Sequence, residues 1–243
     1  METRSDEVAD RIYRLSTFMP GLGGPAGFTF NQYLIDADEP LLYHCGQRAL
    51  FPSVVEAAAR ILDLKRLRWI TFSHGEADES GALNLWLAAA PNAGPAHGRV
   101  GCNIWLADMS DRPPRALADG EILDLGGKRV RHLDTPHVPH DWDASLLFEE
   151  TTATLFCSDL FTQLGDGPAV TSSDILAPAI AVEEKINATS LTIVTAPTVR
   201  RLAALKPRGL ALMHGPAFTG DAAPVLEGLA DYYAGKLRQA VLG

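Results

Sequence analysis

Four short predicted strands in this chain each lead into a segment that holds a histidine or an aspartate, and this recurrence constrains the fold more than any other feature. The runs are RWITFS before His74, KRVRHLD before the segment that holds His137 and His140, TATLFCS before Asp159, and GLALM before His214. Runs of this length and composition predict β-strands. Because α/β folds collect their sites at strand ends, we expect these polar side chains to gather at one place.

The other segments predict strands that pair first with helices, then with each other, and then with helices again. Two apolar runs, FTFNQYLI and LLYHC, are joined at residues 36–40 and predict a hairpin. The predicted helices cover residues 52–63, 81–90, 198–206 and 223–242. The predicted strands cover residues 28–35, 41–45, 68–73, 100–108, 121–125, 128–134, 144–150, 152–158, 191–196 and 209–213. We therefore expect an α/β fold with two mixed sheets sandwiched between helices, in a single domain over residues 1–243.

Composition and charge exclude several classes of protein. The chain has 21 Lys+Arg against 30 Asp+Glu and no cationic run, which argues against nucleic acid as a partner. Its apolar runs are shorter than the roughly 20 residues of a membrane span, and its N-terminus is charged where a signal peptide is apolar. The three scattered cysteines form no CxxC pair, which fits a reducing compartment. We expect a cytoplasmic protein without a membrane association, whose metal ligands, if any, are His and carboxylates.

The segment TFSHGEADESG places His74, Glu76, Asp78 and Glu79 within six positions. Alternate residues of an extended segment point to the same side, so His74, Glu76 and Asp78 can converge on a metal ion. In the competing interpretation, Asp78 or Ser80 caps a following helix and the two glutamates are solvated near its positive end. The three other strand ends that carry His or Asp favour the metal site.

These motifs in this order resemble the metallo-β-lactamase superfamily, from about Asn31 to Gly215. The shared pattern is HxExD, a His near a TP motif, an Asp after a strand and a final His-Gly, and NQYLID resembles the opening hairpin of that family. Most hydrolases of the superfamily carry HxHxDH. A glutamate at the second position, the segment FCSDLF and HGP near the C-terminus instead resemble the flavodiiron branch, which comprises oxygen and nitric oxide reductases and stand-alone oxygen-binding di-iron proteins.

The resemblance implies a metallo-β-lactamase-like αββα sandwich and a dinuclear metal centre. By analogy, one metal takes His74, Glu76 and His140, the other takes Asp78 and His214, and Asp159 bridges the two. Replacing a nitrogen ligand by a carboxylate oxygen hardens the site and favours iron over zinc. The expected cofactors are therefore two iron ions, with zinc or manganese as the alternative.

Three features depart from the family pattern. The residue after Asp78 is Glu79 where most relatives have His, so the second metal can gain a carboxylate, a water or nothing. The TP segment offers two histidines, and we favour His140 because DWDAS follows it, which leaves His137 as the second candidate. His44 and Cys45 replace an Asp-Thr-Gly turn of the family, and we expect them to be packing residues.

We expect no flavodoxin domain and no bound flavin, because no glycine-rich phosphate loop follows a strand near the C-terminus. The Gly-rich segment 21–27 is expected to be a loop beside the metal pocket.

The leading hypothesis is a di-iron protein that binds or reduces dioxygen or nitric oxide with electrons from a separate protein; a homodimer is left open. The alternative is a metal-dependent hydrolase of an ester, thioester or lactone, and a binding protein without turnover fits the same residues. Whether the chain is an enzyme is left undecided by its sequence.

Overall fold

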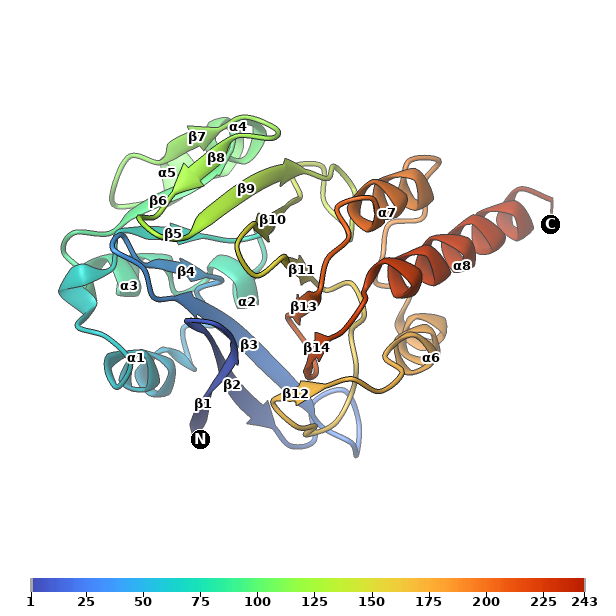
Figure 1. Ribbon diagram of the computed structural model, residues 1–243, viewed down its shortest axis with the longest axis horizontal. Helices are drawn as coiled ribbons and strands as arrows, with labels where there is room; N and C mark the ends of the chain where they lie inside the picture. The colour runs from blue at the N-terminus through green and yellow to red at the C-terminus, as the bar shows by residue number, and fades with distance from the viewer. Residues whose placement is uncertain (1, 243) are drawn as a thin grey trace.

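Two seven-stranded β-sheets lie face to face between helices in the computed structural model, which describes residues 2–242 (Figure 1). The first sheet has the order β1-β2-β3-β4-β5-β6-β7, with β1 Thr3–Ala9, β2 Ile12–Met19, β3 Phe28–Ile35, β4 Leu41–Tyr43, β5 Trp69–Thr71, β6 Gly94–Gly98 and β7 Arg115–Leu117. The second has the order β12-β14-β13-β11-β10-β9-β8, with β8 Ile122–Asp124, β9 Arg129–Asp134, β10 Ser145–Glu149, β11 Thr154–Ser158, β12 Val170–Thr171, β13 Gly209–Leu212 and β14 Ala217–Thr219. Strands β4 to β7 run parallel, as do β11 and β13, whereas β8 to β11 form an antiparallel meander. The predicted pair of mixed sheets is confirmed.

Helices cover the outer face of each sheet. They are α1 Phe51–Ala59, α2 Ala77–Ser80, α3 Leu83–Ala89, α4 Arg99–Gly101, α5 Ala107–Met109, α6 Leu176–Ile186, α7 Thr195–Ala203 and α8 Ala223–Leu242, with a 3₁₀ turn at Leu64–Arg66 and a π-helix at Cys102–Leu106. Helices α1 and α3 pack on the first sheet, and α6, α7 and α8 pack on the second (Figure 1). The αββα order of layers predicted from the sequence is therefore present.

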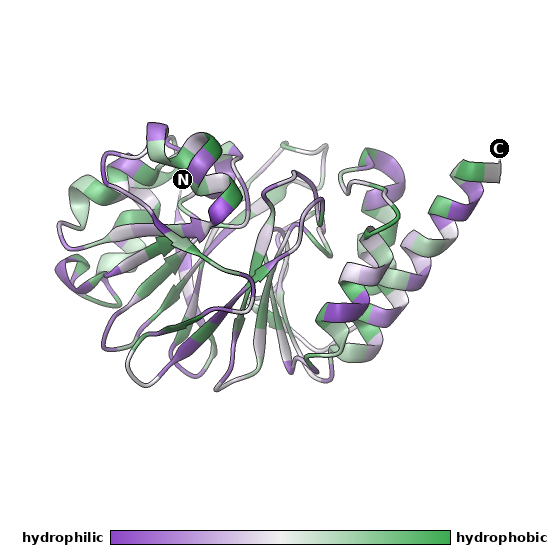
Figure 2. Cartoon of the chain, turned by 90° about the horizontal axis from the view of Figure 1, so that it is seen from above, coloured by the Kyte–Doolittle hydropathy of each residue, from purple (hydrophilic) through white to green (hydrophobic). Residues whose placement is uncertain are grey.

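Three apolar layers hold these elements together. One lies between the sheets, where Tyr33 of β3 meets Phe156 of β11 with ring centroids 5.6 Å apart. The other two lie between a sheet and its helices, and Leu34, next to Tyr33, belongs to one of them. Since both faces of the central strands are buried, their sequences read as continuous apolar runs. Figure 2 shows apolar residues concentrated along the strands and a mixture of polar and apolar residues along α8.

The predicted strand over residues 100–108 is wrong. This segment is helical and comprises the end of α4, the π-helix and the start of α5. Cys102 and Leu106, four residues apart, are buried, whereas Val100 and Ile104 are exposed. That spacing matches one face of a helix and not the alternation of a strand, so the apolar composition of the segment was misleading.

The predicted strand over residues 191–196 is also wrong. Residues 191–194 form a loop and a turn, α7 begins at Thr195, and Ile193 is 81% exposed. No neighbouring strand pairs with this segment among the described residues. The elements β1, β2, β6, β7, β12, β14 and α6 were not predicted; they are short or carry more polar residues, glycines or prolines than the central elements. No described helix combines the length and the hydrophobicity that crossing a membrane requires.

Candidate metal centre

The candidate ligands lie where strand ends of the two sheets meet. His74 follows β5 of the first sheet, and Glu76, Asp78 and Glu79 follow it at the start of α2 and within it. The other three come from the second sheet: His140 lies in the loop between β9 and β10, Asp159 directly follows β11, and His214 follows β13. The structure therefore brings together residues that are up to 140 positions apart (from 74 to 214) in the sequence.

His74, Glu76 and His140 form the first group of ligand atoms. The Nε2 atoms of His74 and His140 are 2.8 Å apart, and His140 Nε2 is 3.3 Å from Glu76 Oε1. One ligand atom from each of the three residues lies within 4.8 Å of the others. This separation allows a single cation to contact all three side chains.

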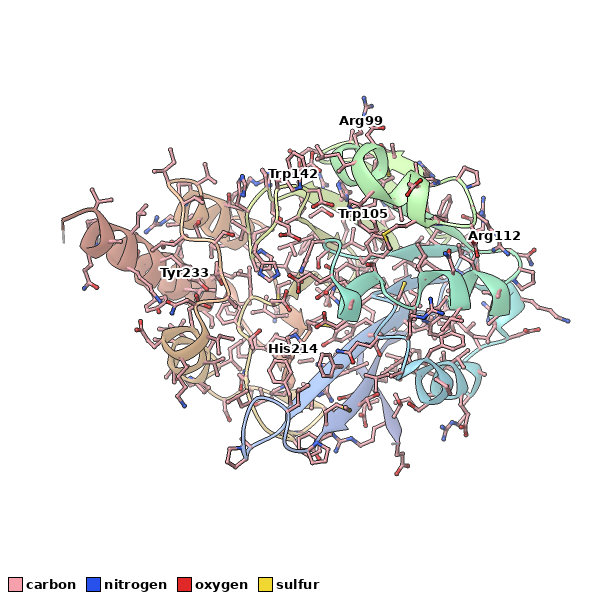
Figure 3. All side chains as sticks on the ribbon, turned by 180° about the vertical axis from the view of Figure 1, so that it is seen from behind. Arg99, Trp105, Arg112, Trp142, His214 and Tyr233 are labelled. Atoms are coloured by element: carbon pink, nitrogen blue, oxygen red, sulfur yellow. The ribbon has the colours of Figure 1, made fainter. Side chains whose placement is uncertain are left out.

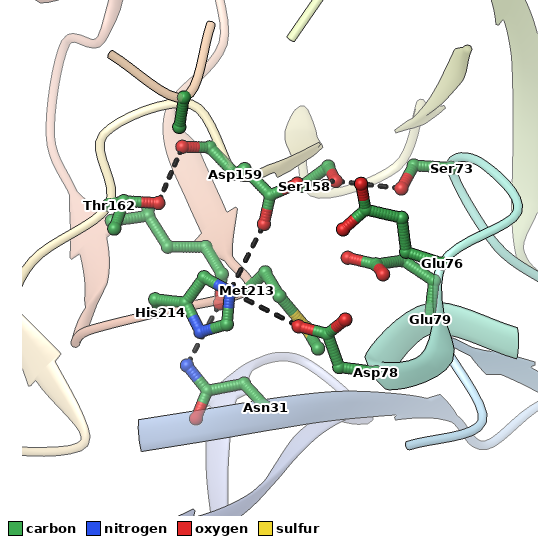
Figure 4. A network of polar contacts seen from close by, with 12 residues as sticks. Asn31, Ser73, Glu76, Asp78, Glu79, Ser158, Asp159, Thr162, Met213 and His214 are labelled. Carbon is green, nitrogen blue, oxygen red and sulfur yellow. Dashed lines mark hydrogen bonds and ion pairs between the residues drawn. The ribbon is translucent and has the colours of Figure 1, made fainter. Parts of the chain in front are cut away.

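Asp159 lies between a pair of histidines, His74 and His140, and a third histidine, His214. Its Oδ2 is 3.5 Å from His74 Nε2 and 3.6 Å from His140 Nε2, whereas its Oδ1 is 3.1 Å from His214 Nε2. His214 Nε2 is in turn 3.5 Å from Asp78 Oδ2, so that His214 stands between the two aspartates (Figure 4). Each oxygen of Asp159 thus faces a different position, which is the geometry a bridging carboxylate needs.

Each of the three histidines makes a polar contact through its Nδ1 atom, which orients the ring. The contacts are His74 Nδ1 to Ser73 Oγ at 2.8 Å, His140 Nδ1 to the Ala188 carbonyl at 3.1 Å, and His214 Nδ1 to the Thr29 carbonyl at 2.8 Å. A carbonyl only accepts, so Nδ1 of His140 and His214 donates and Nε2 is free to bind a metal. Partners of this kind orient the histidines of metal sites.

Two features of the side chains themselves fit a metal ion. The Nε2 atoms of His74 and His140 face each other at 2.8 Å, and two nitrogen lone pairs at that distance require a proton or a cation between them. Glu79 is fully buried, both of its carboxylate oxygens lack a hydrogen-bond partner, and it forms a group with His74 and Asp159 within 4.8 Å. Buried carboxylates without donors call for a positive charge.

The close packing of charges in the cluster shifts several of its pKa values. Burial alone would lower the pKa of His140, but its hydrogen bond to Glu76 and the charge of Asp159 raise that pKa to about 9. Burial would raise the pKa of Asp159, but the hydrogen bond from His214 and the charges of the surrounding histidines hold it well below its usual range. Burial and the charges of Asp159 and Asp78 raise the pKa of Glu79.

The extended geometry that we expected for residues 74–78 ends at Glu76. Glu76 has β-region dihedrals, and α2 begins at Ala77, so Asp78 turns away from His74 and towards His214. The competing interpretation, a helix cap, also differs from the structure. Glu76 is itself the N-cap residue and forms no side-chain cap bond, and the Ser80 hydroxyl donates to the Glu76 carbonyl.

His137 is exposed and belongs to none of the groups of ligand atoms that lie within 4.8 Å of one another in the described chain. His44 is buried behind His74, with Nε2 3.2 Å from Ser73 Oγ and Nδ1 3.0 Å from Met213 Sδ. Burial lowers the pKa of His44 to about 3, so this ring is neutral. Cys45 is buried, as expected for a packing residue.

Replacement of each TP-segment histidine by alanine separates the two candidates. His140→Ala is expected to lose the metal at the first group, because two ligands retain little of the affinity of three, whereas His137→Ala should keep both metals. Metal content per chain after desalting is the measurement. Metal loss in His137→Ala and retention in His140→Ala would move the site to the other histidine.

Several groups that complete the centre could not be predicted from the sequence. The carbonyls of Thr29 and Ala188 hold histidine rings, and the ring of Phe28 stacks on that of His214 with centroids 4.1 Å apart. Backbone carbonyls carry no signal in a sequence, and Phe28 reads as an ordinary strand residue. Only the tertiary arrangement reveals these roles.

A cavity of about 440 Å³ opens beside Asp78. Its lining is mainly apolar and consists of Leu22, Gly23, Phe28, Phe30, Gln47, Asp78, Leu164, Val182, Lys185 and Ile186. The Gly-rich loop that we expected near the metal pocket contributes Leu22 and Gly23. Of the candidate ligands, Asp78 lines this apolar pocket.

A family model described as ODP family beta lactamase matches residues 28–194. Among curated proteins, the chain is 29% identical over 138 residues to putative diflavin flavoprotein A 1 of Nostoc sp., covering 56% of this chain and 24% of that protein. It is 26% identical over 141 residues to the anaerobic nitric oxide reductase flavorubredoxin of Pectobacterium atrosepticum, covering 56% and 27%. The chain thus spans about a quarter of the length of these relatives.

Solved structures share the fold. Rubredoxin oxygen:oxidoreductase from Desulfovibrio gigas superposes with a TM-score of 0.82 at 17% identity, covering 95% of this chain and 62% of that one. A fragment of putative diflavin flavoprotein A 5 from Nostoc sp. PCC 7120 superposes with a TM-score of 0.82 at 16% identity, covering 100% and 99%. At these identities, the likeness is one of fold.

Proposed function

Because this chain belongs to the ODP family of beta-lactamase-like proteins, we propose that it is a di-iron protein that binds or reduces dioxygen or nitric oxide. The proposal rests on the placement of Asp159. One of its carboxylate oxygens faces His74 and the other faces His214, so the side chain can serve two metal positions. The names of the relatives support the choice of ligand, since they include a nitric oxide reductase and an oxygen:oxidoreductase.

We assign one metal position to His74, Glu76 and His140 and the other to Asp78 and His214, with Asp159 between them. Glu79 is the additional candidate ligand, because its buried oxygens lack other partners. A centre this rich in carboxylates favours iron over zinc. When bound, two ferrous ions would supply two electrons to a diatomic ligand.

The chain's own residues would admit and shield that ligand. Phe28 stacks on His214, and Phe30 meets the same ring edge-on at 5.2 Å, so the pocket side of this histidine is covered by apolar surface. An apolar lining suits dioxygen and nitric oxide, which form weak hydrogen bonds, and limits the access of water. The carbonyl of Thr29 keeps the Nδ1 proton of His214 in place and its Nε2 directed at the centre.

We propose that a separate protein supplies electrons for repeated turnover. The three cysteines are buried and unpaired, so the described residues offer no dithiol that could act as an internal donor. The names of two relatives refer to rubredoxin, which makes a rubredoxin a reasonable donor to test.

One observation favours a second candidate function. The cavity beside Asp78 has about 440 Å³, whereas a small molecule such as water takes about 30 Å³ in its liquid. The cavity can therefore accept an organic acyl group as well as a diatomic gas. A metal-dependent hydrolase of a thioester, ester or lactone would use this volume.

Stopped-flow mixing of the ferrous 243-residue protein with dioxygen or nitric oxide tests the proposal. We expect oxidation in a single phase, and further gas consumption only after a reduced rubredoxin or a flavoprotein reductase is added. Failure to react with either gas, together with rapid cleavage of a thioester or lactone, would establish the hydrolase instead. Sustained consumption with NADH alone would contradict the need for a donor protein.

A further inference from the structure

Trp105 covers the backbone between two of the candidate ligands. It lies in the π-helix Cys102–Leu106, below the helical turn that holds Arg99 (Figure 3). A Cβ atom on Gly75 would be 3.1 Å from Cε2 and 3.3 Å from Cζ2 of this indole, so the ring rests directly on the His74-Gly75-Glu76 backbone. A π-turn inside a helical segment costs stability and is frequent at functional sites.

Asp143 fixes the indole. The Nε1–H group of Trp105 donates to Asp143 Oδ2 at 2.6 Å, and the same oxygen is 3.4 Å from Nε2 of the fully buried His97. The side chain of Asp143 is only 4% exposed. Burial would raise its pKa, but the hydrogen bonds from His97 and Trp105 lower it, so the carboxylate is charged and its bond to the indole is charge-assisted.

The Trp105–Asp143 bond joins the two loops that carry the first metal position. Trp105 touches the loop of His74 and Glu76 through Gly75, and Asp143 belongs to the same loop as His140. Close packing leaves little freedom, because a Cβ atom on Gly101 would lie 2.7 Å from Asp143 Oδ2. This bond therefore links the two loops, in addition to the backbone hydrogen bond from the Ser145 N–H to the Ser73 carbonyl at 2.8 Å.

We propose that Trp105 and Asp143 are positioning residues for the metal position formed by His74, Glu76 and His140. They act by holding the two ligand-bearing loops together, and the position of Asp78 and His214 is not expected to depend on the pair. The inference rests on the proposed metal centre, but not on the identity of the metal or on the reaction. Residues that support metal ligands contribute about 10- to 100-fold in affinity.

Titration of the full chain with Co²⁺ in two single-position backgrounds tests the inference. His214→Ala removes a ligand of the second position and leaves the position of His74, Glu76 and His140 to be filled. His140→Ala removes a ligand of that first position and leaves the position of Asp78 and His214. Adding Trp105→Phe, which keeps an aromatic ring but removes the donor, is expected to weaken Co²⁺ binding at least about tenfold in the His214→Ala background. In the His140→Ala background we expect no change beyond about twofold. Calorimetry and the visible absorption of Co²⁺ give both affinities without an assay of activity.

Asp143→Asn is the second variant, because it keeps the shape and one acceptor oxygen and removes the charge. We expect a smaller loss at the same position only. Trp142→Phe is the matched control, since Trp142 adjoins Asp143 but is 60% exposed and has no assigned role. Equal losses at both positions, or none at the first, would overturn the inference. If neither background binds Co²⁺, the metal centre itself is wrong and the inference falls with it.

Discussion

Asp159→Ala is expected to remove both metal ions and to have the largest effect of any single substitution. Its Oδ2 faces His74 and His140 and its Oδ1 faces His214, so one side chain serves both positions. Alanine would leave the first position without its shared oxygen and the second with Asp78 and His214 only, and loss of a ligand removes most of the affinity of such a site. Metal content per chain should fall from about two to near zero.

The matched control for this substitution is Asp134→Ala. Asp134 is also an aspartate at a strand end, but it pairs with His132 at 2.9 Å and is about half exposed. We expect Asp134→Ala to retain both metals. A folded Asp159→Ala protein, judged by circular dichroism, that still holds two metals would disprove the dinuclear arrangement.

Glu76→His is expected to change the metal preference from iron towards zinc. Glu76 Oε1 lies 3.3 Å from His140 Nε2, and the side chain is 51% exposed, so the larger imidazole has room. The substitution replaces a hard oxygen ligand by nitrogen and removes one negative charge, and both changes disfavour ferric iron. The zinc-to-iron ratio of protein expressed with both metals should rise several-fold.

Glu76→Gln separates charge from ligand type, because it removes the charge and keeps an oxygen. We expect it to weaken metal binding without a comparable rise in the zinc-to-iron ratio. An unchanged ratio in Glu76→His would mean that Glu76 does not bind the metal. Metal analysis of both variants from the same medium gives the comparison.

Much of the fold could be predicted because its central strands are buried on both faces. The run TLFCS is buried at every position and forms β11, and the apolar run GLAL forms β13. Residues 100–108 show where this reasoning fails, since apolar composition alone does not separate a strand from a helix. Val100, Cys102, Ile104 and Leu106 repeat at every second position, which is the pattern of a strand, and only the burial of Cys102 and Leu106 in the structure reveals a helical face.

The candidate site could be predicted only in part, for a similar reason. The sequence identified residues that the structure brings together, such as His74, Asp159 and His214, because each follows a strand and strand ends meet. It did not identify Trp105 or the Thr29 carbonyl. Their contacts depend on a π-helix and on strand β3 of the other sheet, and neither leaves a local pattern next to the ligands.

The metal content of the purified protein tests the central claim most directly. Protein expressed in iron-replete medium and purified without added metal should contain about two iron atoms per chain, and its oxidised form should absorb in the near ultraviolet as oxo-bridged ferric iron does. Two zinc ions per chain with negligible iron, together with esterase activity, would contradict the account.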